Sequence, residues 1–130
     1  MLRIALAEDH AELRTTIRLF LGLLKNIEVV FEATNGREAI EGVQRHQTDV
    51  LVMDMMMPEL NGLEAAKKIA DLSLPTRVIL ISSLQGIAPE QAAMAAGAQG
   101  FVCKDDLIQL LPVAIETVAQ GGRFFAQESA

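Results

Sequence analysis

The feature that most constrains the fold is a regular alternation between short apolar runs and longer segments with apolar residues at helical spacing. The apolar runs predict five strands, at residues 2–7, 28–33, 50–53, 77–81 and 100–102. The longer segments predict five helices, at residues 11–24, 36–45, 62–72, 89–96 and 107–120. This alternation is typical of βα units around a parallel sheet, with right-handed crossovers. We therefore predict an α/β fold, with a doubly wound sheet of five strands between two layers of helices.

The composition fits one such domain. With 130 residues the chain has room for a single core, and 51% hydrophobic against 4% aromatic residues predicts a core of aliphatic side chains. Strands of a parallel sheet are covered on both faces, and the continuously apolar runs at 50–53 and 77–81 suit that position.

The charge and the single cysteine limit the functional classes. A net charge of −6 argues against a nucleic-acid-binding surface, which needs clustered Lys and Arg. The acidity fits a cation site, but it also simply keeps a small domain in solution. Cys103 has no partner for an intramolecular disulfide, and the N-terminal segment turns acidic at Glu8, too early for a signal peptide or a membrane span. We expect a reducing, cytoplasmic setting and no membrane partner.

Polar side chains follow four of the predicted strands, each at the carboxyl end. Glu8 and Asp9 come after the first strand, Asp54 ends the third, Ser82 ends the fourth, and Lys104 follows the fifth. In doubly wound sheets the working groups collect at this edge. One acid near a strand end means little, because loops are polar. Three acids, a hydroxyl and a Lys at equivalent ends predict a functional site.

These residue types suit phosphoryl transfer. Three carboxylates repel one another, and a hard divalent cation such as Mg²⁺ relieves that repulsion through oxygen ligands. A carboxylate such as Asp54, placed between the cation and the ammonium group of Lys104, can act as a nucleophile and form an aspartyl phosphate. The cation, Lys104 and the Ser82 hydroxyl would stabilise the charge of the transferring group.

With these residues in view, the chain resembles a known family over nearly its whole length. The matching segments are residues 7–10 (AEDH), 54–64 (DMMMPELNGLE), 81–83 (ISS) and 96–105 (AGAQGFVCKD). They are similar to the motifs of response-regulator receiver domains, the CheY-like superfamily. The resemblance implies a flavodoxin-like three-layer sandwich with strand order 2-1-3-4-5.

The resemblance also implies a cation site for Mg²⁺ or Mn²⁺. Asp54 would be the phosphoacceptor and a metal ligand, and Asp9 would bind the metal directly. Glu8 would act mainly through a coordinated water, and Met56 would contribute its backbone carbonyl oxygen.

Further positions are implied to act in switching. Lys104 would contact the phosphoryl group, Ser82 would be the hydroxyl that moves toward it, and Phe101 would be the ring whose orientation changes with it. Met56 and Leu84 stand where side chains in this family influence loss of the phosphoryl group to water. Neither can orient a water by a hydrogen bond, so we expect slow self-dephosphorylation.

The C-terminal part differs from the commonest family pattern. Lys104 is followed by Asp105 instead of Pro, and the sequence does not decide whether this bond is cis. Lys-Asp at this point and the GGRFF sequence at 121–125 resemble the NarL/FixJ subgroup, whose receivers usually precede a DNA-binding helix-turn-helix domain. We predict a receiver domain at 1–120 and a tail or linker at 121–130, with the output domain absent from this chain.

The resemblance implies a signalling switch and not an enzyme with sustained turnover. A sensor histidine kinase would donate the phosphoryl group from its phosphohistidine, phosphorylation would favour a homodimer, and transcription would be regulated through DNA bound by the absent output domain. Alternatives are a stand-alone receiver that controls a protein partner, a receiver that only binds, and an aspartate-nucleophile phosphohydrolase. Such phosphatases usually carry a second acid two positions after the nucleophile, where this chain has Met56.

Overall fold

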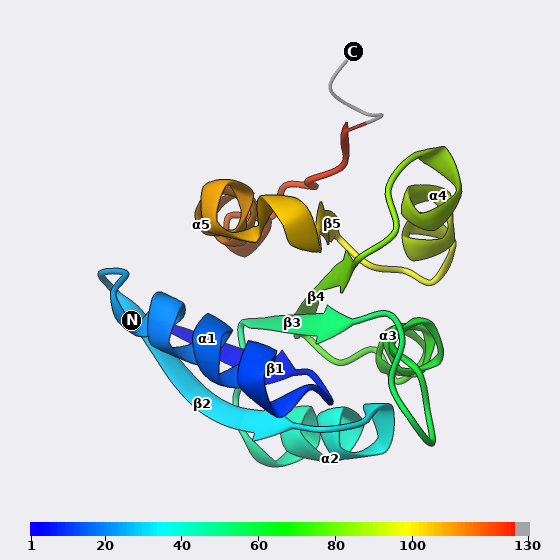
Figure 1. Cartoon of the computed structure of the whole chain (residues 1–130). Helices are drawn as coiled ribbons and strands as arrows, with labels where there is room; N and C mark the ends of the chain where they lie inside the picture. Colours follow the sequence, from blue (N-terminus) through cyan, green and yellow to red (C-terminus); the bar gives the residue numbers. More distant parts are fainter. Residues whose placement is uncertain (127–130) are drawn as a thin grey trace.

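Strands and helices alternate along the chain as the sequence predicts (Figure 1). The computed structural model describes residues 1–126. The strands are β1 (Leu2–Ala7), β2 (Ile27–Ala33), β3 (Val50–Asp54), β4 (Arg77–Ser82) and β5 (Gly100–Cys103). The helices are α1 (Ala11–Gly22), α2 (Gly36–Arg45), α3 (Gly62–Asp71), α4 (Ile87–Ala95) and α5 (Leu107–Ala119), and a short 3-10 turn, η1 (Lys104–Asp106), precedes α5. None of these helices is both long and apolar enough to span a membrane.

The five strands form one parallel sheet with the order β2-β1-β3-β4-β5. Helices α1 and α5 pack on one face of this sheet, and α2, α3 and α4 pack on the other (Figure 1). The fold class and the strand order predicted from the sequence are therefore confirmed.

The central strand β3 is covered on both faces, which explains why its sequence is continuously apolar. Every residue of the strand is buried. Val50 and Val52 join the core under α1 and α5, whereas Leu51 and Met53 join the core under α2, α3 and α4. Asp54 is the last residue of this strand. A central strand that is buried along its whole length thus carries the carboxylate that the sequence singles out.

Two helix boundaries differ from the predictions by two residues, and the others agree within one residue. Helix α4 begins at Ile87 instead of residue 89, so Pro89 lies within its first turn. This is tolerated because the first amides of a helix have no intrahelical acceptor, and Pro has no amide proton to lose. Helix α1 ends at Gly22 instead of residue 24, and Asn26, with φ of 65°, turns the chain into β2.

The segment after α5 returns to the sheet and lies along β5. Phe124 forms an isolated parallel bridge with Gly100: its amide donates to Gln99 O at 2.9 Å, and its carbonyl accepts from Phe101 N at 3.0 Å. The ring of Phe125 is buried in the core on the α4 side of the sheet. Such pairing covers a sheet edge that would otherwise present free backbone groups. The last four residues of the predicted tail, 127–130, lie outside the described part of the chain.

We expect Phe125→Ala to lower the free energy of unfolding by about 3 kcal/mol, because it deletes a buried aromatic ring from the core. Phe124→Ala is the matched control, since Phe124 is only partly buried. Phe124→Ala should lower the free energy of unfolding by clearly less than Phe125→Ala does. Urea unfolding of the two variants and the parent chain measures both values. Equal losses in the two variants would contradict the docking of Phe125.

Candidate functional site

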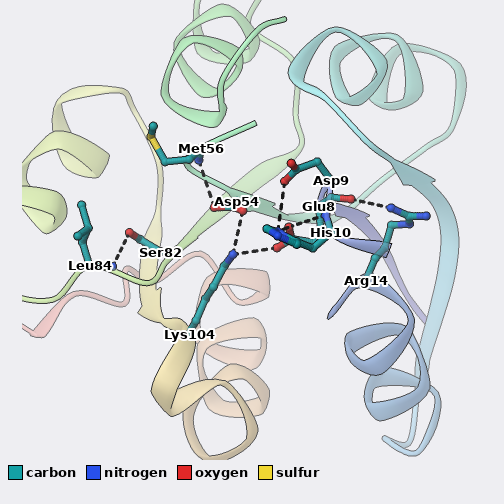
Figure 2. Close-up of polar contacts among 9 residues, drawn as sticks. All are labelled: Glu8, Asp9, His10, Arg14, Asp54, Met56, Ser82, Leu84 and Lys104. Atoms are coloured by element: carbon teal, nitrogen blue, oxygen red, sulfur yellow. Dashed lines mark hydrogen bonds and ion pairs between the residues drawn. The ribbon is translucent and has the colours of Figure 1, made fainter. Parts of the chain in front are cut away.

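The polar residues that follow the strands lie at one edge of the sheet (Figure 2). Strands β1, β3, β4 and β5 are successive neighbours in the sheet and run parallel, so their carboxyl ends meet there. Glu8 and Asp9 follow β1, Asp54 ends β3, Ser82 ends β4, and Lys104 opens η1 after β5. The topology brings together groups that are far apart in the sequence, as predicted.

Lys104 joins two of the carboxylates. Its Nζ donates a hydrogen bond of 2.9 Å to Asp54 Oδ2 and lies 3.2 Å from Glu8 Oε1 (Figure 2). Burial alone would lower the pKa of Lys104, but the hydrogen bond with Asp54 and the charges of Asp54 and Glu8 outweigh it and raise that pKa. Lys104 is therefore a fixed positive charge near neutral pH. The Lys104–Asp105 peptide bond, left undecided by the sequence, is trans.

Glu8 is fully buried beneath the site. Burial raises the pKa of its carboxyl, as does the charge of Asp54, whereas the amide of His10 and the ammonium of Lys104 pull that pKa down. The balance is a raised pKa. Oε2 accepts a hydrogen bond of 3.1 Å from His10 N, but Oε1 accepts none from residues 1–126, although Lys104 Nζ is within ion-pair distance. Glu8 thus retains acceptor capacity for a cation or its bound water.

The loop after β3 holds the Asp54 carboxylate from the other side. Met56 N donates to Asp54 Oδ1 at 3.1 Å, so each oxygen of Asp54 has one partner. At the start of α3, Gly62 donates its amide to Met55 O at 2.9 Å. A Cβ at Gly62 would clash with the Asp54 carbonyl oxygen, so only glycine lets the loop close this tightly.

The acidic pair, Glu8 and Asp9, forms with His10 a group that could hold a metal ion. Ligand atoms of Glu8, Asp9 and His10 all lie within 4.8 Å of one another. Carboxylate oxygens are the ligands that Mg²⁺ prefers. His10 is exposed, but its Nδ1 lies 3.7 Å from Glu8 Oε2 and 3.9 Å from Asp9 Oδ1. The sequence indicates this proximity, because His10 directly follows the two acids.

The hydroxyl of Ser82 points away from Asp54 (Figure 2). Its Oγ accepts a hydrogen bond of 3.0 Å from Leu84 N in the loop before α4, and the residue is buried. Phe101, the aromatic residue of β5 singled out from the sequence, is buried in the core that also contains Phe125. Ser82 thus lies at the sheet edge that holds the carboxylates, but its hydroxyl does not hydrogen-bond to them in this structure.

Sequence reasoning missed Arg14. From the first turn of α1 its Nη1 donates a hydrogen bond of 2.9 Å to the backbone carbonyl of Glu8 (Figure 2). Arg14 lies four residues after His10, so the two share a helix face that points back toward the end of β1. That spacing places Arg14 near the acids, but it does not determine the hydrogen bond.

The chain is similar to known proteins over nearly its whole length. A family model described as "Response regulator receiver domain" matches residues 4–116. Response regulator UvrY of Escherichia coli (strain K12) is 35% identical over 130 residues, covering 100% of this chain and 60% of that protein. Transcriptional regulatory protein DesR of Bacillus subtilis (strain 168) is 34% identical over 128 residues, covering 98% of this chain and 63% of that protein. The chain therefore spans less than two thirds of the length of these relatives.

Solved structures give the same result. The signal receiver domain of the putative response regulator NarL from Mycobacterium tuberculosis has a TM-score of 0.88 and 33% identity, covering 92% of this chain and 97% of that one. A two-component response regulator of the LuxR family from Aurantimonas sp. SI85-9A1 has a TM-score of 0.90 and 31% identity, covering 97% of this chain and 90% of that one. The chain belongs to the response regulator receiver domain family, and its relatives are of the NarL/FixJ type.

Proposed function

We propose that this domain is a phosphorylation switch in which Asp54 accepts a phosphoryl group from the phosphohistidine of a sensor histidine kinase. One observation carries the proposal: the buried carboxylate of Asp54 lies 2.9 Å from Lys104 Nζ, at the edge that also holds Glu8 and Asp9. Gathering buried charges at one edge costs stability unless they are well paired. A catalytic role gives a reason for that arrangement.

The proposed transfer needs no general base, because the attacking group is already an anion. A carboxylate oxygen of Asp54 bonds to phosphorus, the P–N bond of the phosphohistidine breaks, and its electron pair returns to the imidazole ring. Lys104, which stays charged because its pKa is raised, pairs with Asp54 before transfer. It would then pair with an oxygen of the phosphoryl group and offset its negative charge.

We propose Mg²⁺, or Mn²⁺ in its place, as the cation at this site. The donors fit, since the carboxylates of Asp9 and Asp54 are hard oxygen ligands and Glu8 offers a buried oxygen that accepts no hydrogen bond from residues 1–126. Asp9 and Asp54 would bind the cation directly, Glu8 would act through a water, and Met56 would add its backbone carbonyl. The bound cation would neutralise charge on the transferring group.

Switching would begin at Ser82. Its hydroxyl accepts from the amide of Leu84 before phosphorylation, and we propose that it turns toward the phosphoryl group afterwards. The ring of Phe101 would move with it. Because Phe101 lies in the core next to α4 and the C-terminal segment, this change would reach the surface formed by β4, α4, β5 and α5.

The output proposed for this receiver is transcription regulation in the cytoplasm. DesR, a relative that is longer than this chain, is described as a transcriptional regulatory protein. DNA would be bound by an output domain outside the residues of this chain, and phosphorylation would favour a homodimer. A stand-alone receiver acting on a protein partner is the alternative. A phosphohydrolase is disfavoured because Met56 stands where such enzymes need a second acid.

Incubation with acetyl phosphate and Mg²⁺ should add one phosphoryl group to the chain, measured by intact-protein mass spectrometry. Acetyl phosphate stands in for the phosphohistidine donor. Asp54→Asn, which keeps the size of the side chain but removes the nucleophilic charge, should gain nothing. The parent chain without Mg²⁺ is the second control. An adduct on Asp54→Asn, or no adduct on the parent chain together with failure to bind beryllofluoride, would contradict the proposal.

The phosphorylated domain should lose its phosphoryl group slowly, because neither Met56 nor Leu84 can orient an attacking water. Both side chains are largely exposed, at 66% and 61%, so they can be replaced without disturbing the core. The double substitution Met56→Asn with Leu84→Glu should shorten the lifetime of the phosphorylated form about tenfold by positioning a water. Decay followed by mass spectrometry measures this. An unchanged lifetime would refute the explanation.

A further inference from the structure

Arg14 forms a bridge between the cation site and strand β2. Its Nη1 donates to Glu8 O at 2.9 Å, and its Nε lies 3.4 Å from Glu32 Oε1 at the end of β2. One helical turn later, Arg18 Nε lies 3.2 Å from the other oxygen of Glu32. The two arginines therefore share one acid, but of the two only Arg14 hydrogen-bonds to the turn that carries the acidic pair.

Other side-chain contacts also hold that turn: Glu8 Oε2 accepts a hydrogen bond from His10 N at 3.1 Å, and Glu8 Oε1 lies 3.2 Å from Lys104 Nζ. The turn connects β1 to α1 through Glu8, Asp9 and His10, and His10, as N-cap of α1, makes no side-chain capping bond. The backbone bonds that hold it are Glu8 N to Ala33 O at 2.9 Å and, within the first helical turn, Arg14 N to His10 O at 2.9 Å. The guanidinium of Arg14 adds a charge-assisted bond at the carbonyl directly before Asp9, and bonds of this kind are stronger than neutral ones.

We propose that Arg14 is a positioning residue for the cation site, and that its guanidinium, steadied by Glu32, holds the Glu8–Asp9 turn in the geometry that binds Mg²⁺. This inference rests on the proposed function, in which Glu8 and Asp9 serve the cation. Mg²⁺ demands near-ideal octahedral geometry, so a looser turn would weaken binding. Partners that orient metal ligands in this way commonly contribute tenfold or more to affinity.

The sign of the effect separates positioning from simple electrostatics. A positive charge close to a cation site repels Mg²⁺, so removing that charge should tighten binding if Arg14 acts through charge alone. If Arg14 positions the turn, removing it should weaken binding in spite of the lost repulsion. Arg18 provides the control, because it pairs with the same carboxylate of Glu32 at a similar distance.

The test is a residue-resolved NMR titration of the full chain with Mg²⁺, in the parent and in Arg14→Met, Arg18→Met and Arg14→Lys. We expect Arg14→Met to raise the Kd for Mg²⁺ about tenfold, and Arg18→Met to leave it within about a factor of two. Arg14→Lys keeps the charge but loses the forked guanidinium, so it should raise the Kd about threefold. Thermal melts without Mg²⁺ should be similar for Arg14→Met and Arg18→Met.

Three results would overturn the inference: Arg14→Met binds Mg²⁺ as tightly as the parent or more tightly, Arg14→Met and Arg18→Met weaken binding equally, or Arg14→Lys matches the parent. If Arg14→Met does not fold, the comparison of Arg14→Lys with the parent still decides. Failure of the proposed function looks different. In that case Mg²⁺ would cause no shifts at Asp9 or Asp54 in the parent chain itself.

Discussion

The ion pair of Lys104 with the carboxylates of Asp54 and Glu8 is the interaction on which the site depends. Asp54 and Glu8 are both buried, and burial, with the charge of Asp54 as a smaller cause, raises the pKa of the Glu8 carboxyl. An ammonium group at 2.9 Å and 3.2 Å from the two acids makes their joint burial tolerable. With Asp9 included, the cluster still carries more negative than positive charge. This excess is what a divalent cation would balance.

Two features of the scaffold fix the position of the Asp54 carboxylate. Asp54 ends the fully buried strand β3, and Gly62 allows the following loop to close on its backbone. Ser82 lies on β4 and Phe101 on β5. The segment that docks through Phe124 covers the outer edge of β5. In the proposed switch, Asp54 would stay in place while Ser82 and Phe101 move.

The strands and the residues that gather at one sheet edge were predictable from patterns in the sequence, whereas the strand order was implied by the family resemblance. Alternating apolar runs fix the strands, and acids at strand ends meet whenever parallel strands are neighbours. Contacts that depend on tertiary packing were not predictable. Phe124 and Phe125 show no strand pattern in the sequence. Phe124 pairs with β5 because no other strand occupies that edge of the described sheet, and Phe125 packs in the core. The direction of the Ser82 hydroxyl and the bond from Arg14 to Glu8 depend on side-chain rotamers, which spacing does not determine.

The central claim is that Asp54 is the acceptor and that Lys104 moves from its carboxylate to the phosphoryl group. A crystal structure of the chain with Mg²⁺ and beryllofluoride, which imitates the phosphoryl group, tests this most directly. The account predicts beryllium bonded to an oxygen of Asp54, Lys104 Nζ paired with a fluoride, and the Ser82 hydroxyl released from the Leu84 amide, where it now accepts at 3.0 Å. Beryllofluoride bound elsewhere, or bound at Asp54 while Lys104 contacts only Glu8, would contradict it.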